Sequence, residues 1–138
     1  MKFPYLKLPS VDPKLKWVAR PYIQIKLTGL KDYRIGYALI DSGADRCLFN
    51  IEIAEKIGLD LTEAPEEIFG GIEGGKLIVK LHKIKIQIVG MSEEIEVIAG
   101  FVKSSGVTAI LGQEGFFDRF RIKFERDHGV VEINSVRK

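Results

Sequence analysis

The chain has 138 residues, of which 46% are hydrophobic and 29% are charged, a composition typical of one soluble globular domain. Its net charge of +2 is too small to predict binding to nucleic acid or to an anionic membrane. No apolar run approaches the ~18 residues of a membrane helix. The single cysteine, Cys47, cannot form a disulfide within the chain, and Met1 to Ser10 lacks the apolar run of a signal peptide. We therefore expect a soluble, cytoplasmic protein.

The first part of the chain contains a proline-rich segment followed by two strand patterns. Residues 1–20 hold three of the five prolines and predict an N-terminal arm or an irregular strand ahead of one domain over residues 21–138. Polar and apolar residues alternate over residues 22–28, which predicts a strand. Residues 34–40 end in consecutive apolar positions, which indicates a second strand buried on both faces. A loop is expected after it.

The rest of the chain predicts more strands and little helix. Asn50 is a suitable N-cap for a short helix over residues 51–57, and Gly58 can end it in the left-handed conformation. One or two helical turns are expected at residues 114–118. Further strands are predicted at residues 67–69, 76–89, 93–102, 107–111, 120–124 and 130–133. The alternation changes phase near His82, which predicts a bulge or a bend. This pattern indicates a mainly β fold, a closed or semi-closed barrel with one or two short helices.

Asp41 is the candidate catalytic residue. It directly follows the apolar end of the second predicted strand and begins the sequence Asp41-Ser42-Gly43. Asp-Ser-Gly is also ordinary turn chemistry, but a strand that ends on a carboxylate at the edge of a core favours catalysis. Hydrolysis of a peptide by water needs a base and an acid, and two carboxylates that share one proton supply both. No other aspartate precedes Ser-Gly or Thr-Gly, so the second carboxylate must be Asp41 of a second copy across a two-fold axis.

Four segments resemble the retropepsins, the retroviral-type aspartic proteases and their non-viral cellular relatives. Residues 38–45 (Ala-Leu-Ile-Asp-Ser-Gly-Ala-Asp) resemble the active-site loop, and residues 69–75 the glycine-rich β-hairpin flap. Residues 76–90 are similar to the strands that return from the flap, and residues 109–112 (Ala-Ile-Leu-Gly) to the segment behind the catalytic loop. Residues 114–120 are similar to the short helix that follows in non-viral members. The resemblance covers roughly residues 20–134.

The resemblance implies a homodimeric aspartic endopeptidase that acts on a peptide or an unfolded protein and needs no cofactor or metal. Asp41 would activate the shared water, Ser42 would hydrogen-bond across the dimer, and Gly43 would let backbone approach the substrate. Flap closure would hold the substrate and exclude water. The implied substrate-binding residues are Ala44, Asp45, Gly70, Gly71, Ile72, Glu73 and Gly74. The implied supports of the catalytic loop are Ile110, Leu111 and Gly112.

Two positions depart from the charge pattern of the family, Gln113 and Glu73. Many relatives have an arginine directly after Ile-Leu-Gly, where it pairs with the acid that corresponds to Asp45. This chain has Gln113 there, so the ion pair is missing or is supplied by Arg46 or Arg119. Glu73 adds a second departure, a charge near the flap tip, where relatives are often apolar or have glycine.

Other functions stay open at this point. The main alternative is a catalytically silent, dimeric peptide-binding module of the same fold. The N-terminal arm could also be a cleavable leader, and it is, with residues 130–133, a candidate for the dimer interface. A cysteine hydrolase built on Cys47 is disfavoured because nothing marks that thiol as activated. A metal site at Asp41 and Asp45 lacks a third nearby ligand.

Overall fold

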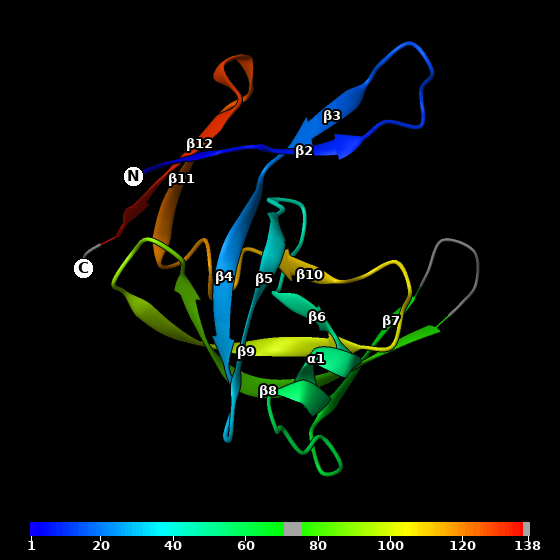
Figure 1. The fold of residues 1–138 in the computed structure, drawn as a ribbon. Coiled ribbons are helices and arrows are strands. Elements are labelled where there is room, and N and C mark those ends of the chain that lie inside the picture. Colours follow the sequence, from blue (N-terminus) through cyan, green and yellow to red (C-terminus); the bar gives the residue numbers. More distant parts are fainter. Residues whose placement is uncertain (71–75, 137–138) are drawn as a thin grey trace.

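Twelve strands in three sheets account for most of the computed structural model, which describes residues 1–70 and 76–136 (Figure 1). The strands are β1 (Lys2–Pro4), β2 (Leu6–Pro9), β3 (Trp17–Arg20), β4 (Tyr22–Thr28), β5 (Tyr33–Ile40), β6 (Leu48–Asn50), β7 (Glu66–Gly70), β8 (Lys76–Ile88), β9 (Glu94–Val102), β10 (Ala109–Leu111), β11 (Phe120–Glu125) and β12 (Val130–Ser135). The helical segments are α1 (Ile51–Lys56) and the 3-10 turn η1 (Arg126–His128). The predicted mainly β fold is confirmed.

The largest sheet has the strand order β4-β5-β10-β6-β9-β8-β7, and an additional pairing joins β4 to β8. Six of its strands therefore form a closed ring, with β7 attached outside the ring through β8. The long strand β8 serves both partners: its first part pairs with β7 from Gly70↔Lys76 onward, and its last part pairs with β4 from Thr28↔Lys85 to Ile25↔Ile88.

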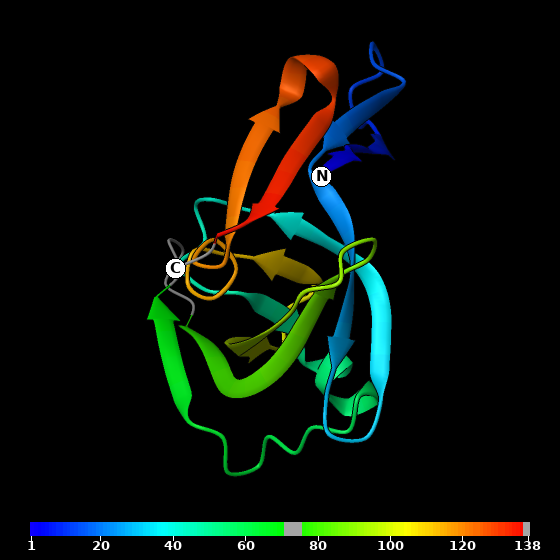
Figure 2. The ribbon, with the colours of Figure 1, turned by 90° about the vertical axis from the view of Figure 1, so that its left-hand side faces the viewer.

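This change of partner explains the phase change near His82. The ladder between β8 and β9 runs without interruption from Val79↔Val102 to Gln87↔Glu94, so the strand contains no bulge in this ladder. The strand bends instead, and Figure 2 shows β8 strongly curved. Val79 is buried before the bend, and Ile84 is the next buried residue after it. These positions differ by an odd number, so the alternation of buried and exposed residues changes phase between them. Of the two sequence-based alternatives, the bend is the one found.

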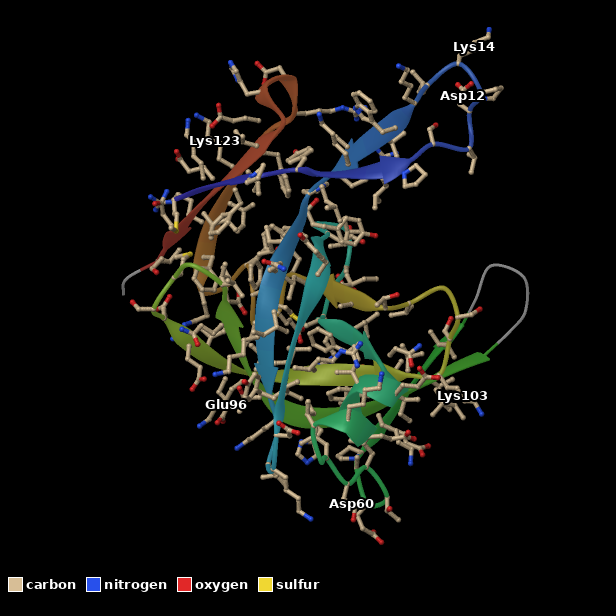
Figure 3. All side chains as sticks on the ribbon, viewed as in Figure 1. Asp12, Lys14, Asp60, Glu96, Lys103 and Lys123 are labelled. Carbon is tan, nitrogen blue, oxygen red and sulfur yellow. The ribbon has the colours of Figure 1, made fainter. Side chains whose placement is uncertain are left out.

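The core fills the inside of the ring and is built from alternate residues of its strands. Three strands contribute three residues each: Ile23, Ile25 and Leu27 of β4, Ile84, Ile86 and Ile88 of β8, and Ile95, Val97 and Ala99 of β9. Helix α1 contributes Ile53 and Ala54. Charged side chains stay outside: Figure 3 shows Glu96 of β9 and Lys123 of β11 pointing away from the ring. None of the buried residues in the described ranges is polar or charged.

The segment expected as an arm or irregular strand forms three short strands. β1 pairs antiparallel with β12, in a sheet of order β1-β12-β11, and β2 forms a hairpin with β3. Pro4 and Pro9 are the last residues of β1 and β2, where a missing N–H is tolerated. Figures 1 and 2 show both units at the same end of the molecule, above the ring.

The helical expectations are partly met. The Asn50 side chain caps α1 by accepting from the Glu52 N–H at 3.0 Å, and Gly58 adopts φ +76°, as predicted. Where one or two helical turns were expected at residues 114–118, residues 115–119 form consecutive hydrogen-bonded turns, and the Phe120 N–H donates to the Phe116 carbonyl at 3.1 Å, as in a helical turn. The buried ring of Phe116 anchors these turns, and the Phe117 N–H is directed back to the Gly112 carbonyl at 3.3 Å. No helix in residues 1–70 or 76–136 is long and apolar enough to span a membrane.

Candidate active site

Asp41 lies at the end of β5, between two fixed strands. The Ile40 N–H donates to Pro21 O on one side at 3.0 Å, and the Asp41 N–H donates to Leu111 O on the other side at 3.0 Å. Ala38 and Ile40 are buried in the core just before it. Asp41 is itself half-buried, so its carboxylate starts from a fixed backbone and still reaches the surface. This is the placement that the apolar strand end predicts.

The residues after Asp41 form a tight turn that holds its side chain. The Ala44 N–H donates to Asp41 O at 3.2 Å, and the Gly43 N–H donates to Asp41 Oδ1 at 2.9 Å. A backbone N–H that binds a carboxylate oxygen fixes the rotamer of the acid. Ser42 and Gly43 are exposed, so the turn is open to a ligand or to another protein chain.

Strand β10 and the glycine after it lie directly behind this turn. Ile110 and Leu111 are paired in parallel with Leu39 and Ile40 of β5. A Cβ atom on Gly112 would lie 2.5 Å from Arg46 O and 2.7 Å from Ala44 O, so only glycine fits here. The segment that the sequence predicts to support the loop is therefore in contact with the turn after Asp41.

Gln113 binds the backbone of the turn after Asp41 at two points. Its N–H donates to Ala44 O at 2.8 Å, and its side-chain Nε2 donates to Ser42 O at 2.7 Å. A second backbone bond follows next to the first: the Glu114 N–H donates to Asp45 O at 2.9 Å. The sequence does not predict the contact of the Gln113 side chain with Ser42 O. From the sequence, Gln113 is noted only because many relatives have an arginine at this position. No local pattern could reveal it, because its partner lies 71 positions away.

Asp45 is exposed and forms no ion pair with any residue of the described ranges. Arg46, one expected replacement for the missing arginine, instead pairs with Glu67 at 2.9 Å and with Glu114 at 3.6 Å. Arg119, the other expected replacement, forms no ion pair within these ranges either. Of the two alternatives, an absent ion pair at Asp45 is the one that the structure shows.

The hairpin expected to be the flap is described on both sides of residues 71–75. β7 and β8 form an antiparallel hairpin whose last described pair is Gly70↔Lys76. The predicted substrate-binding residues Gly71, Ile72, Glu73 and Gly74 lie outside the described residues. The Arg46–Glu67 ion pair links β7 to the end of the loop that follows Asp41, so the base of the hairpin and this loop are joined directly.

The rival chemistries find little support in the described residues. Cys47 is fully buried, and desolvation raises the pKa of its thiol, although hydrogen bonds from the Gly112 and Phe116 backbone and the charge of Arg46 act in the opposite direction. His82 contacts Lys83 O at 2.7 Å and His128 contacts Asp127 at 3.2 Å, so neither is an evident base for this thiol. Within residues 1–70 and 76–136 no group of three potential ligands could hold a metal ion.

Comparison with known proteins finds similarity in structure only. No protein-family profile and no curated protein sequence matches the chain. A retropepsin-like aspartic protease from Rickettsia conorii is similar in structure, with a TM-score of 0.65 and 14% identity over 97% of this chain and 98% of that one. The retroviral protease-like domain of Ddi1 from Leishmania major gives a TM-score of 0.60 and 18% identity over 86% and 91%. At these identities the likeness concerns the fold, and the chain has the retropepsin-like fold that its sequence predicts.

Proposed function

We propose that the protein is a homodimeric aspartic endopeptidase of the retropepsin type, which hydrolyses a peptide or an unfolded protein. The observation that carries this proposal is the Asp41 carboxylate, presented at the end of β5 and held by the Gly43 N–H at 2.9 Å. A carboxylate oriented by backbone at an open turn, within this fold, is suited to activating a water molecule.

The proposed reaction uses two copies of Asp41. The ionised carboxylate takes a proton from water as the water oxygen attacks the peptide carbonyl carbon, and the protonated one gives its proton to the carbonyl oxygen. The Asp41 that took the water proton then gives it to the amide nitrogen, the other Asp41 takes a proton from a hydroxyl of the tetrahedral intermediate, and the C–N bond breaks to give an acid and an amine. Asp41 accepts no hydrogen bond from another carboxyl group of the described chain, so one chain alone supplies half of this chemistry.

A second copy is the proposed source of the other half. The exposed Ser42 and Gly43 would meet their counterparts across a two-fold axis, as an isologous interface requires. β1 and β12, the earlier candidates for the interface, are paired with each other within one chain. Their three-stranded sheet still has β1 and β11 at its two edges, and we propose that it contributes to the dimer from there.

The substrate is proposed to lie extended between the catalytic turn and the flap. Ala44 and the unpaired Asp45 would contact it from one side. Gly70 and the flap-tip residues Gly71, Ile72, Glu73 and Gly74 would contact it from the other side, by strand-like hydrogen bonding. Because Asp45 forms no ion pair in the described chain, its carboxylate is available to a substrate N–H group.

The test is the nearly isosteric variant Asp41→Asn, which removes the titrating acid. Wild type should cleave an unfolded protein somewhere within about pH 3–8, and the variant should fold and dimerise but not cleave. Asp127→Asn, an exposed turn position, is the matched control and should cleave like wild type. The specific activity of wild type should also fall on dilution as the dimer dissociates.

The outcomes separate the two candidate functions. Cleavage by Asp41→Asn at the wild-type rate would show that another group performs the chemistry. A wild type that dimerises and binds peptide but cleaves no substrate would support the silent peptide-binding module. Specific activity that stays constant well below the dimer dissociation constant would contradict a shared site.

A further inference from the structure

The peptide group between Ser42 and Gly43 is hydrogen-bonded at both of its ends. Its carbonyl oxygen accepts from Gln113 Nε2 at 2.7 Å, and its N–H donates to Asp41 Oδ1 at 2.9 Å. A trans peptide group is planar, and its C=O and N–H point in opposite directions. A bond that fixes the carbonyl therefore also sets the direction of the N–H toward the carboxylate.

Gln113 is well placed to act on this peptide group. Its own backbone N–H is bound to Ala44 O at 2.8 Å, so the residue that carries the amide is fixed to the same turn. Only the nitrogen of a glutamine amide can donate to a carbonyl oxygen, so the orientation of the Gln113 side chain follows from its partner. The amide is also neutral, and it binds the backbone of the turn while Asp45 stays without an ion pair.

We propose that Gln113 is a positioning residue for Asp41, acting through the Ser42–Gly43 peptide group. This inference rests on the proposed function. Consecutive hydrogen bonds polarise one another, so the bond at the carbonyl strengthens the Gly43 N–H as a donor to the carboxylate. Gln113 thereby orients the acid without touching the substrate.

The first test is Gln113→Met, which keeps the length of the side chain and removes its donor. We expect kcat to fall about tenfold while KM changes less than about twofold, because the turn is altered and not the substrate contacts. Gln87→Met is the matched control: the Gln87 amide also donates to a backbone carbonyl, Met91 O at 3.0 Å, but away from this turn. It should leave both constants unchanged.

A second variant, Gln113→Glu, restores the donor only when its carboxyl group is protonated. Its kcat relative to that of Gln113→Met should rise as pH falls through the range around 4.3, the ordinary value for a glutamate. The charged groups on the turn and the adjoining segment are Asp41, Asp45, Arg46 and Glu114, and they displace this range in both directions. A ratio that stays flat with pH would contradict a role for the donor.

The Gly43 amide signal in an NMR spectrum gives a readout that does not depend on activity. We call the two hydrogen bonds from Gln113 to Ser42 O and from the Gly43 N–H to Asp41 the relay. Its loss in Gln113→Met should move the signal of the Gly43 amide proton upfield and speed the exchange of this proton with solvent. Gln87→Met should have neither effect. An unchanged Gly43 signal overturns the inference, as does an unchanged kcat in an active enzyme. If wild type shows no cleavage that depends on Asp41, the proposed function fails and the Gly43 signal alone decides whether the relay exists.

Discussion

Gly112 offers a direct test of how closely β10 supports the turn that carries Asp41. In Gly112→Ala the new Cβ atom would start 2.5 Å from Arg46 O and 2.7 Å from both Ala44 O and Arg46 C. All three are backbone atoms, so no side-chain rotation can relieve the contact. The turn that carries Asp41 has to move away from β10.

The size of the effect follows from these distances. Ordinary contacts of a Cβ atom begin at 3.4 Å, so the turn must shift by close to 1 Å, and overpacking of this kind costs about 1–3 kcal/mol. The shift also weakens the hydrogen bond from the Gln113 N–H to Ala44 O, which adds about 1 kcal/mol. The free energy of unfolding should fall by about 2–4 kcal/mol in total. For a chain of this length that lowers Tm by roughly 6–14 °C.

Thermal unfolding followed by circular dichroism measures the change. Gly36→Ala is the matched control, because a Cβ atom on Gly36 in β5 would meet no atom within 4 Å, and its Tm should stay close to that of wild type. If the Tm of Gly112→Ala also lies within about 2 °C of wild type, then β10 does not constrain the turn as described. The support assigned to Gly112 would then have to be abandoned.

Two further predictions concern stability alone. Asn50→Ala removes the cap of α1 and the two bonds from Nδ2 to Ser104 O at 2.9 Å and Val107 O at 3.1 Å, so urea unfolding should show a loss of about 2–3 kcal/mol. A loss below about 1 kcal/mol would contradict this joint role. Burial raises the pKa of Cys47 in the folded protein, so the unfolded chain loses this proton first as pH rises. Wild type should therefore lose stability above about pH 8.5 relative to Cys47→Ala, and parallel pH curves for the two proteins would contradict it.

Local patterns predicted most of the fold because most elements are defined by local chemistry. Alternation identified β4 and β9, and the cap at Asn50 together with Gly58 delimited α1. The one or two helical turns expected at residues 114–118 correspond to consecutive turns at residues 115–119, which the buried Phe116 ties to the core. The bend in β8 could be predicted from the phase change in the sequence. Its cause could not, because β8 pairs first with β7 and then with β4, and β4 is far away in the sequence.

The candidate site divides in the same way. Asp41 and the segment ending at Gly112 could be predicted, because an apolar strand that ends on an acid and a glycine after a buried strand are local signals. The contact of Gln113 with Ser42 could not be predicted, because a side chain that binds backbone 71 positions away has no periodicity. The unpaired state of Asp45 could not be predicted either, since it depends on Arg46 having Glu67 and Glu114 as partners.

The parallel pairing of β5 with β10 has a consequence for synthesis of the protein. Asp41 emerges from the ribosome early, but Leu111, whose carbonyl accepts its N–H, is made much later. Pairings between segments so far apart in sequence form slowly and only after the intervening chain is complete. The turn around Asp41 therefore cannot take its final shape on a nascent chain that ends before β10.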